Sequence, residues 1–338
     1  MQPYKTVIIG CGSIGANKPD KIDFPDSTNI LTHAHAVYRH PRTELLGIVD
    51  TDNQKLMTAK EKWKPQLTVR AYGDILSHDG KAPDIVIVAV PTKYHYEILH
   101  EIFISGPLPK LIITEKPFCS KLNLAKAITE SYSEQNVPIM IDYIRRYAAK
   151  YQEIKWQIDK GHFGKVLNAR VLYTRGLRHE GCHAIDLMRY FFGECTMVEN
   201  LSGLTIFDRI ENDLFDRVED DLSKPVWFNF EKCESVIFQP CNGKKYGIFE
   251  IDISFEQGRL RFIDNGLQVE FYPINAENEW GQKSLDYNLT TVIRQETGLN
   301  TALYNLIDNA VNFLDRKQDL ICTAEDGIKV HEILEGLR

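Results

Sequence analysis

Three glycines near the start of the chain stand at a spacing that suits phosphate binding. Gly10, Gly12 and Gly15 form the pattern G-x-G-x-x-G directly after an apolar run. The first glycine of such a turn permits a tight bend, the second lets the backbone approach a pyrophosphate, and the third lets a helix pack closely on the strand. The pattern predicts a dinucleotide site, to which Ser13 and Ile14 also contribute.

An acidic partner for the adenosine ribose is expected about 20 residues after the last glycine, at the end of the second strand. Asp50 ends the run LLGIVD but stands 35 residues after Gly15. The excess falls in residues 16–32, which are rich in Pro, Asp and Asn and predict a loop inserted before the first helix. Asp50 either binds the ribose or only caps a turn. Because Thr51 follows and no arginine stands close behind it, NAD is expected and NADP is less favoured.

Two histidines four residues apart stand in the segment HEGCHAID, with a glutamate between them. The spacing of His179 and His183 places both side chains on one face of a helix. Two such histidines can share a metal ion with Glu180, but no third ligand at a suggestive spacing follows. No metal site is therefore expected.

These residues depend on the elements that position them. Apolar, β-branched runs alternate with helical segments through the first 142 residues, which predicts an α/β domain with a doubly wound parallel sheet. Ligands of such sheets bind beyond the C-terminal ends of the strands, so motifs are sought there. Strands are expected at 5–9, 44–49, 85–89, 111–114 and 139–142, with the clearest helices at 94–105 and 122–135.

Motifs do follow the later strands. VAVPTKYHYE comes after the third, ITEKPFC after the fourth and DYIRRY after the fifth, and GHFGKVLNARVLY and GCHAIDLMRYFFGE come later. In this order the set resembles the glucose–fructose oxidoreductase, inositol dehydrogenase and MocA (Gfo/Idh/MocA) family of NAD(P)-dependent oxidoreductases. The resemblance runs through the whole chain to the segments GIFEIDISFEQGRLRFIDNG and CTAEDGIKVHEILEGLR.

The resemblance implies two domains. Residues 1–142 would form a Rossmann dinucleotide-binding domain, and residues 143–338 a domain for substrate binding and oligomerisation, built on a large, mostly antiparallel sheet with a closing C-terminal helix. Such sheets pack face to face between subunits, which implies a homodimer or homotetramer. The sequence itself predicts strands at 166–175, 197–206, 225–239, 245–255 and 258–272, a hairpin turn at 240–243 and a helix at 302–316.

The resemblance also assigns chemistry to Lys116 of the E-K-P motif, which in this family lies near the nicotinamide and the reacting carbon. Burial and neighbouring positive charge would lower the pKa of such a lysine and let it relay protons near neutral pH. Glu115 belongs to the same cofactor-binding segment. Pro91 and Thr92 match a family turn over the nicotinamide, and His95 matches a position close to the cofactor.

The main departure from the family concerns its D-x-x-x-H pair. His183 matches the histidine, but His179 fills the place of the catalytic aspartate. In the preferred interpretation His183 is the general base and His179 orients a substrate of different charge, such as an acidic sugar. In the second, Glu180 supplies the carboxylate, and in the third the protein binds ligands without chemistry. Asp186, further along, is expected to be structural.

Two further groups of polar residues have open roles. Arg145 and Arg146 match the turn that opens the family's substrate domain. One of them faces the substrate, or the two form a solvated ion-paired surface. Of the remaining histidines, His33, His35 and His40 are interpreted as structural or solvent-exposed.

Composition excludes several classes of function. The 338 residues carry 40 Lys and Arg against 47 Asp and Glu, a net charge of −7, and 43% are hydrophobic. Nucleic-acid binding is not expected without clustered Lys and Arg, nor is a membrane span, because no apolar stretch approaches the roughly 20 residues required. Seven scattered cysteines and a first strand that leaves no room for a signal peptide predict a cytoplasmic protein with reduced thiols.

Three functions follow as hypotheses. The first is an NAD-dependent oxidoreductase that transfers a hydride between the nicotinamide and a sugar, nucleotide sugar or sugar-derived alcohol. The second is a redox-neutral sugar enzyme that uses tightly held NAD for epimerisation or elimination. The third is a non-catalytic regulatory protein of the same fold that binds sugar and NAD. No motif identifies the sugar.

Overall fold

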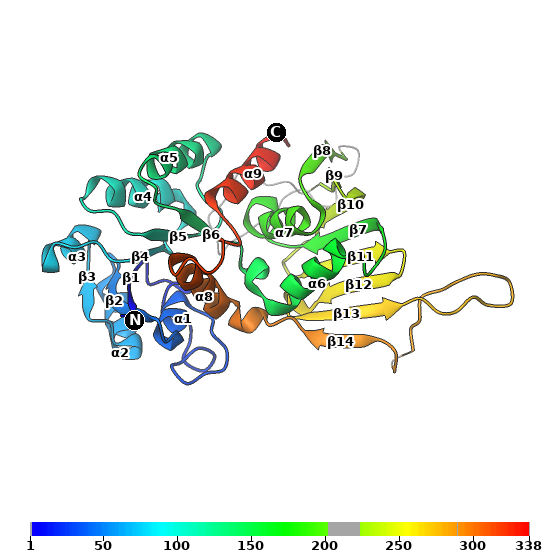
Figure 1. The fold of residues 1–338 in the computed structure, drawn as a ribbon, viewed down its shortest axis with the longest axis horizontal. Coiled ribbons are helices and arrows are strands. Elements are labelled where there is room, and N and C mark those ends of the chain that lie inside the picture. Colours follow the sequence, from blue (N-terminus) through cyan, green and yellow to red (C-terminus); the bar gives the residue numbers. More distant parts are fainter. Residues whose placement is uncertain (1, 202–223, 289, 338) are drawn as a thin grey trace. The chain divides into compact units, whose positions relative to one another are not determined.

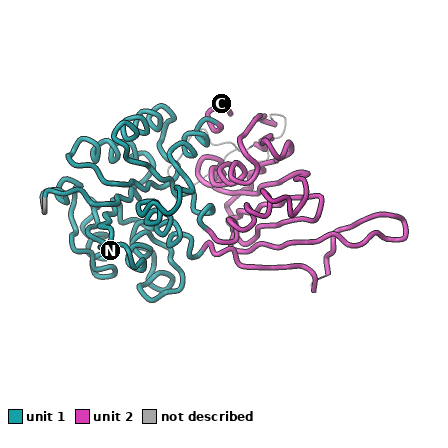
Figure 2. Tube along the Cα trace, in the orientation of Figure 1, with its two compact units in different colours: residues 1–147, 300–332 teal, residues 148–299, 333–338 magenta. Residues whose placement is uncertain are grey.

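The computed structural model describes residues 2–201, 224–288 and 290–337. The chain forms two compact units, residues 1–147 with 300–332 and residues 148–299 with 333–338 (Figure 2). This division differs from the expected boundary at residue 142. The segment 300–332 returns to the first unit, so each unit is built from two stretches of chain.

The first unit contains a six-stranded parallel sheet in the order β3-β2-β1-β4-β5-β6 (Figure 1). The predicted doubly wound sheet is confirmed, and β1 lies at its centre between β2 and β4. The short β3 was not predicted, since its three half-buried residues give little apolar signal. The strands are β1 (Tyr4–Ile9), β2 (Thr43–Val49), β3 (Leu67–Val69), β4 (Ile85–Val88), β5 (Leu111–Glu115) and β6 (Ile139–Asp142).

Helices of this unit come from both stretches of chain. The predicted helix at 302–316 is α8, whose buried face includes Leu303, Leu306 and Ile307. Each such side chain contributes about 1.5–3 kcal/mol when fully buried. The helices are α1 (His33–Arg39), α2 (Asn53–Trp63), α3 (Tyr72–Asp79), α4 (His95–Ile104), α5 (Leu122–Glu134), α8 (Ala302–Leu314) and α9 (Ala324–Glu335), with short 3₁₀ turns η1 (Thr92–Tyr94), η2 (Ile144–Tyr147) and η5 (Leu299–Thr301). The last residues of α9, from 333 on, and the first residue of η5 belong to the second unit.

Polar contacts explain why α8 belongs to the first unit. Asp315, just after the helix, accepts hydrogen bonds from the Tyr4 hydroxyl at 2.8 Å and from Arg42 at 2.9 Å. His40 Nε2 lies 3.3 Å from Asp308 Oδ1 on the helix itself. These contacts join α8 to the start of β1 and to the segment between α1 and β2.

The second unit contains an eight-stranded sheet in the order β14-β13-β12-β11-β7-β10-β9-β8, antiparallel except for β7 with β10. The predicted large, mostly antiparallel sheet is confirmed. The strands are β7 (Val166–Tyr173), β8 (Cys195–Asn200), β9 (Val226–Phe230), β10 (Cys233–Pro240), β11 (Phe249–Phe255), β12 (Gly258–Ile263), β13 (Gln268–Pro273) and β14 (Ile293–Glu296). The predicted strand 197–206 extends into residues outside the described ranges.

Three predictions for this unit require correction. The run 225–239 is two strands, because a turn at Glu231 and Lys232 separates β9 from β10. The run 258–272 is likewise β12 and β13, separated by the 3₁₀ turn η4 (Asp264–Gly266). The segment 240–243 is not a hairpin turn, because β10 and β11 pair with opposite edges of β7 rather than with each other.

The helices of the second unit are α6 (Ala149–Asp159) and α7 (Cys182–Phe192), the latter preceded by a π-helical turn, η3 (Leu177–Gly181). Along β11 and β12 buried and half-buried residues alternate, as expected for a sheet with one covered face. The covered face is aromatic. Tyr151 of α6 stacks on Phe262 of β12 with ring centroids 4.5 Å apart.

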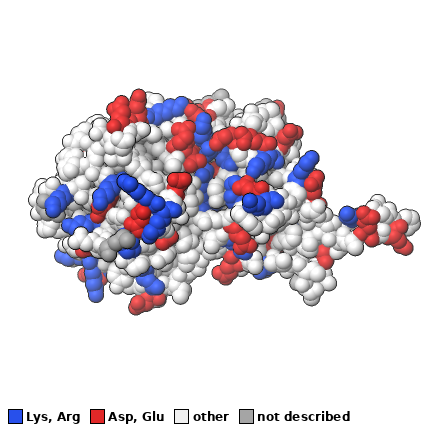
Figure 3. All heavy atoms as spheres, viewed as in Figure 1, with Lys and Arg blue, Asp and Glu red and all other residues white. Residues whose placement is uncertain are grey.

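Surface charge agrees with the composition. On the face shown in Figure 3, Lys and Arg side chains are interspersed with Asp and Glu rather than gathered into a basic patch. Among helices of the described ranges, none is both long enough and apolar enough to cross a membrane.

Candidate functional site

The glycine turn has the geometry that its spacing predicts. Gly10 adopts φ +99°, and a Cβ there would lie 2.6 Å from the carbonyl oxygen of Ala89. A Cβ on Gly15 would lie 1.9 Å from the carbonyl oxygen of Gly10, whereas one on Gly12 would meet nothing within 4 Å. Two of the glycines are thus required by close backbone packing. Gly12 instead leaves open space beside the turn, and the binding of a pyrophosphate there stays a prediction.

The long spacing to Asp50 has a simple structural cause. After one turn at Gly12–Ala16 the chain leaves the helix, and it re-enters at His33, whose N–H donates to the carbonyl of Ile14 at 3.0 Å. The next N–H, of Ala34, donates to Gly15 at 2.9 Å. His33 therefore takes the helical place of residue 18. Removing the 15 residues 18–32 from the separation of 35 leaves 20, the spacing typical of dinucleotide sites.

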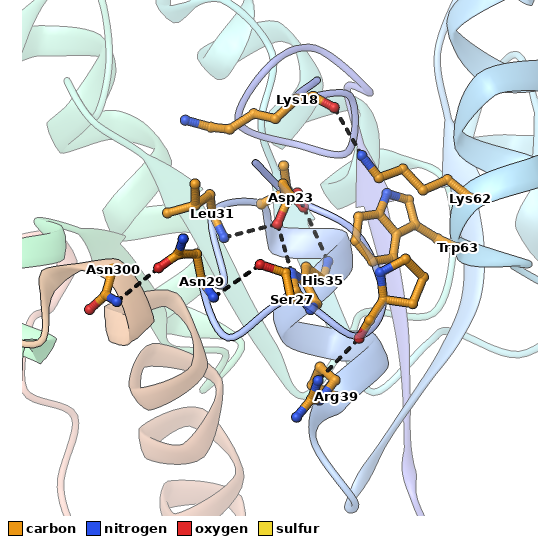
Figure 4. A network of polar contacts seen from close by, with 12 residues as sticks. Lys18, Asp23, Ser27, Asn29, Leu31, His35, Arg39, Lys62, Trp63 and Asn300 are labelled. Carbon is orange, nitrogen blue, oxygen red and sulfur yellow. Dashed lines mark hydrogen bonds and ion pairs between the residues drawn. The ribbon is translucent and has the colours of Figure 1, made fainter. Parts of the chain in front are cut away.

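The excursion formed by residues 18–32 is held by a polar network (Figure 4). The carboxylate of Asp23 accepts a hydrogen bond from Thr32 Oγ1 at 2.7 Å and contacts His35 Nδ1 at 2.6 Å, and both ionisable side chains are fully buried. Burial raises the pKa of Asp23, but hydrogen bonds from His35, Thr32 and the Leu31 N–H outweigh it and leave the pKa below its usual value. The inserted loop is confirmed, and it is anchored rather than loose.

Asp50 lies beside the glycine turn. Its Oδ2 accepts a hydrogen bond from the Cys11 N–H at 2.8 Å, and its Oδ1 accepts one from the Asp52 N–H at 2.9 Å. The carboxylate thus stands at the end of β2, next to the turn after β1. Its binding of a ribose stays a prediction.

One residue near this position was missed from the sequence. The exposed Arg70, just after β3, donates to the carbonyl oxygen of Thr51 at 3.2 Å. No signal in the sequence around Thr51 could have shown this, because the guanidinium comes from a neighbouring strand. A positive group therefore stands beside the loop that follows Asp50.

A buried histidine, His95, contacts the loop that follows β4. His95 is fully buried, with Nε2 2.8 Å from the carbonyl oxygen of Val90 and Nδ1 3.0 Å from that of Phe118. Burial lowers the pKa of its imidazole. The ring therefore ties the loop carrying Pro91 and Thr92 to the E-K-P segment, and its direct contact with a cofactor stays a prediction.

A buried cluster of ionisable groups lies where β5 and β6 end. Glu115 and Asp142 are paired neighbours in the register of these strands. His33, at the start of α1, places Nε2 2.9 Å from Glu115 Oε1 and 3.6 Å from Asp142 Oδ2. Burial and the adjacent Glu115 carboxylate raise the pKa of Asp142 well above its usual value. His33 is thus buried beside two carboxyl groups, and the sequence did not predict this contact.

Lys116 directly follows Glu115 in the sequence and is half-buried. Its positive charge acts on both carboxyl groups, favouring their ionised forms. The three ligand atoms of His33, Glu115 and Asp142 lie within 4.8 Å of one another, an arrangement compatible with a small cation as well as with shared protons.

The two arginines after β6 are both buried, so a solvated ion-paired surface is not what they form. Arg146 donates to Asp326 Oδ1 at 3.0 Å and to the carbonyl oxygen of Ile321 at 3.2 Å. These contacts fasten η2 to the start of α9. A substrate contact by Arg145 or Arg146 stays a prediction.

The remaining candidate residues belong to the second unit. His179 and Glu180 lie in the π-helical turn η3 and His183 in the first turn of α7, all three half-buried. Single π turns are frequent at functional sites. Glu180 accepts a hydrogen bond from Thr174 Oγ1 at 3.0 Å, and its other carboxylate oxygen lies 3.9 Å from Arg175.

The candidate residues therefore fall in two groups, one in each unit. The first unit holds the glycine turn, Asp50, the E-K-P segment and both arginines, and the second holds the two histidines and Glu180. Asp186, expected to be structural, is buried in α7, 4.0 Å from Arg189.

Most of the first unit matches a known protein family. Residues 4–143 match the family described as "Oxidoreductase family, NAD-binding Rossmann fold" (GFO_IDH_MocA). Among curated relatives, scyllo-inositol 2-dehydrogenase (NAD(+)) of Bacillus subtilis is 29% identical over 125 residues. That match covers 32% of this chain and 35% of the relative, so the chain spans about a third of that protein's length.

Solved structures share the fold along nearly the whole chain. The WlbA dehydrogenase of Bordetella pertussis, in complex with NADH and UDP-GlcNAcA, has a TM-score of 0.69 at 17% identity, covering 99% of this chain and 95% of that one. A super-repressor mutant protein of Saccharomyces cerevisiae has a TM-score of 0.73 at 14% identity with the same coverage. At these identities the likeness concerns the fold.

Proposed function

We propose that this chain, whose residues 4–143 belong to the Gfo/Idh/MocA family of NAD-binding oxidoreductases, transfers a hydride between a nicotinamide dinucleotide and a hydroxyl-bearing carbon of a small molecule. One observation carries the proposal. The glycine turn after β1, Asp50 after β2 and Lys116 after β5 all lie at the C-terminal edge of one parallel sheet. That edge is where such sheets bind their ligands.

A sugar, nucleotide sugar or sugar-derived alcohol is the proposed substrate class. The inositol dehydrogenase relative supports a polyol, and the structural neighbour that holds UDP-GlcNAcA supports an acidic nucleotide sugar. His179 in place of an aspartate removes one negative charge from the site, which favours an acidic substrate. Assembly into a homodimer or homotetramer through the eight-stranded sheet is part of the same proposal.

NAD is proposed as the cofactor in preference to NADP. Asp50 presents a carboxylate beside the glycine turn, where it would accept hydrogen bonds from ribose hydroxyls and repel a 2′-phosphate. Among the described residues Arg70 is a feature that favours NADP, and its guanidinium is engaged with the carbonyl of Thr51. When bound, the nicotinamide ring supplies the site that accepts or returns the hydride.

The residues of the chain would manage the substrate oxygen and its proton. Lys116 would donate a hydrogen bond to the oxygen, and His183 would accept the hydroxyl proton as general base. His179 would orient the substrate. Glu180 is less suited to this work, because Thr174 and Arg175 already engage its carboxylate.

Lys116→Met tests the proposal, with Lys110→Met as its matched control. Lys110 and Lys116 flank β5 at its two ends, and Lys110 is 63% exposed in a surface pair with Asp84. Protein with NAD or NADP is mixed with fractionated metabolite extract while NADH or NADPH fluorescence is followed. We expect Lys116→Met to bind NAD normally and lose about 10²–10⁴-fold in turnover, and Lys110→Met to retain both.

Either of two results would contradict the proposal. Turnover retained by Lys116→Met would remove Lys116 from the chemistry. NAD binding without hydride exchange in any fraction, even in a single turnover, would favour the regulatory alternative. Cofactor that copurifies and never exchanges would instead favour the redox-neutral enzyme.

A further inference from the structure

The cluster of His33, Glu115 and Asp142 has more ionisable groups than a structural ion pair needs. Glu115 and Asp142 stand opposite each other in the register of β5 and β6, and one carboxyl oxygen of each lies within 4.8 Å of the other and of a ring nitrogen of His33. Two ionised carboxylates have only acceptors, so a hydrogen bond between them can form only when one of the carboxyls carries a proton. Burial favours such a proton, because two uncompensated negative charges side by side in a protein interior are strongly unfavourable.

The contacts of His33 indicate which of its ring nitrogens carries a proton. His33 Nε2 faces both carboxyls, whereas its Nδ1 has no hydrogen-bond partner among the described residues. The neutral tautomer with the proton on Nε2 satisfies the one contact available and leaves no buried N–H without an acceptor. The cluster then holds one negative charge, shared by Glu115 and Asp142.

A bound metal ion fits this geometry less well. A histidine that ligates a metal through one nitrogen almost always donates the other N–H to a carboxylate, a carbonyl or a water. His33 Nδ1 has no carboxylate or carbonyl acceptor in the part of the chain that the structure describes. Proton sharing therefore explains the cluster better than a cation does.

Two other ionisable groups, His95 and Lys116, interact electrostatically with these carboxyls. His95, from α4, interacts electrostatically with Glu115, but both of its ring nitrogens face carbonyl oxygens and burial keeps the ring neutral. Lys116 is the cation among the groups that act on both carboxyls. The charge of the cluster and that of Lys116 therefore balance.

We propose that Glu115 and Asp142 share a single proton, with His33 donating to the pair, and that the one negative charge left on the pair offsets the positive charge of Lys116. The three are positioning residues that act through Lys116. If the function proposed above holds, Lys116 and His183 have separate roles at the substrate oxygen. Lys116 stabilises the developing alkoxide as a hydrogen-bond donor, and His183 alone receives the proton.

The proposal predicts an unusual pattern among substitutions. In Asp142→Asn the Glu115 carboxylate carries the charge, and in Glu115→Gln the Asp142 carboxyl can ionise and carry it. Each single variant thus keeps one negative charge beside Lys116, and only the double variant removes it. The effects on Lys116 are therefore expected to be strongly non-additive.

Infrared spectroscopy of the full-length protein at neutral pH tests the shared proton. Wild type is expected to show the carbonyl stretch of a protonated carboxylic acid, shifted in D₂O. Both Asp142→Asn and Glu115→Gln are expected to lose it. A wild-type spectrum without this band, or a band that survives both substitutions, would overturn the proposal, as would a stoichiometric metal ion found by elemental analysis.

Labelling of Lys116 by an amine-reactive reagent, quantified by mass spectrometry, tests the charge balance, because only the neutral amine reacts. In the double variant we expect labelling on the order of tenfold faster than in wild type, and in each single variant a change within about twofold. Lys110 in the same samples is the internal control. Equal labelling in wild type and the double variant would overturn the proposal.

Neither readout requires substrate or turnover, so this inference and the proposed function can fail separately. A protein that shows the band and the labelling pattern but never exchanges hydride keeps the charge balance and loses the oxidoreductase. A protein that turns over without the band loses only the shared proton. Far-UV circular dichroism verifies folding of the double variant, and if it does not fold the infrared result on the single variants decides.

Discussion

Helix α1 carries two buried histidines, two residues apart, whose surroundings differ in one respect. His35 meets one carboxylate, that of Asp23 in the excursion, at 2.6 Å. His33 meets two carboxyls, those of Glu115 and Asp142, at 2.9 and 3.6 Å. All five of these residues are largely or fully buried, so burial does not distinguish the two clusters.

The difference in carboxyl number changes what each cluster can do. The carboxylate of Asp23 is satisfied by its contacts with His35, Thr32 and the Leu31 N–H, and the result is an anchored loop. The cluster at His33 holds a second carboxyl and a shared proton, and Glu115 directly precedes Lys116 in the sequence. The one-to-one pair therefore anchors a loop, whereas the two-to-one cluster places a negative charge next to a lysine.

The largest expected effect comes from breaking the one-to-one pair. Asp23→Ala leaves His35 buried without its partner and removes acceptors from Thr32 and the Leu31 N–H. We expect a loss of about 3–5 kcal/mol in the free energy of unfolding, measured by urea denaturation. Asp23→Asn, which keeps the shape, should lose less. A loss below about 1 kcal/mol for the alanine variant would show that the excursion is not anchored by this pair.

The two clusters should also respond to pH in opposite directions. The pKa of Asp23 is lowered by folding, so its contribution to stability is present above the unfolded value near 3.9 and is lost as the pH falls through the folded value. The pKa of Asp142 is raised, chiefly by burial, so its contribution is fully present below about pH 3.9 and is lost as the pH rises toward the folded value.

Denaturation of wild type, Asp23→Asn and Asp142→Asn from pH 3 to 8 measures this opposition. Relative to wild type, Asp142→Asn should gain stability as the pH rises, by at most about 1.4 kcal/mol per pH unit. Asp23→Asn should instead close its deficit as the pH falls. Parallel curves for Asp142→Asn and wild type would mean that Asp142 is ionised in the folded protein.

The smallest expected effects come from replacing the histidines themselves. The glutamine amide in His33→Gln can still donate to Glu115, so we expect a loss of about 1 kcal/mol in the free energy of unfolding. His35→Gln should lose a similar amount through its contact with Asp23. Neither variant should change Lys116 labelling by more than about twofold, because the glutamine amide of His33→Gln is neutral and still donates to the pair. A tenfold change in His33→Gln alone would show that the histidine carries charge in the cluster.

Much of the first unit was predictable because its signals are local. Buried parallel strands such as β4 and β6 are continuous apolar runs, and their predicted ends differ from the observed ones by at most one residue. The second unit was predicted less accurately. The tight turns at Glu231 and Asp264 lie within apolar strand patterns, so β9 with β10 and β12 with β13 each gave one predicted strand.

The candidate site shows the same division between local and distant information. The turn geometry at Gly10, Gly12 and Gly15 could be predicted from their spacing, because it depends mainly on residues close to them in the sequence. His33 gave no comparable signal, because its partners stand 82 and 109 positions further along the chain and only the register of β5 with β6 brings them together. Arg70 was missed for the same reason.

The sequence by itself determined the alternation of strands and helices, the geometry of the glycine turn and the resemblance to a family, since these depend on residues close in the chain. Only the tertiary structure decided that residues 18–32 leave and re-enter one helix, that residues 300–332 complete the first unit, and that His33 meets two carboxyls. These outcomes depend on which strand ends and helix starts are brought side by side, and that proximity is set by the packing of the whole sheet.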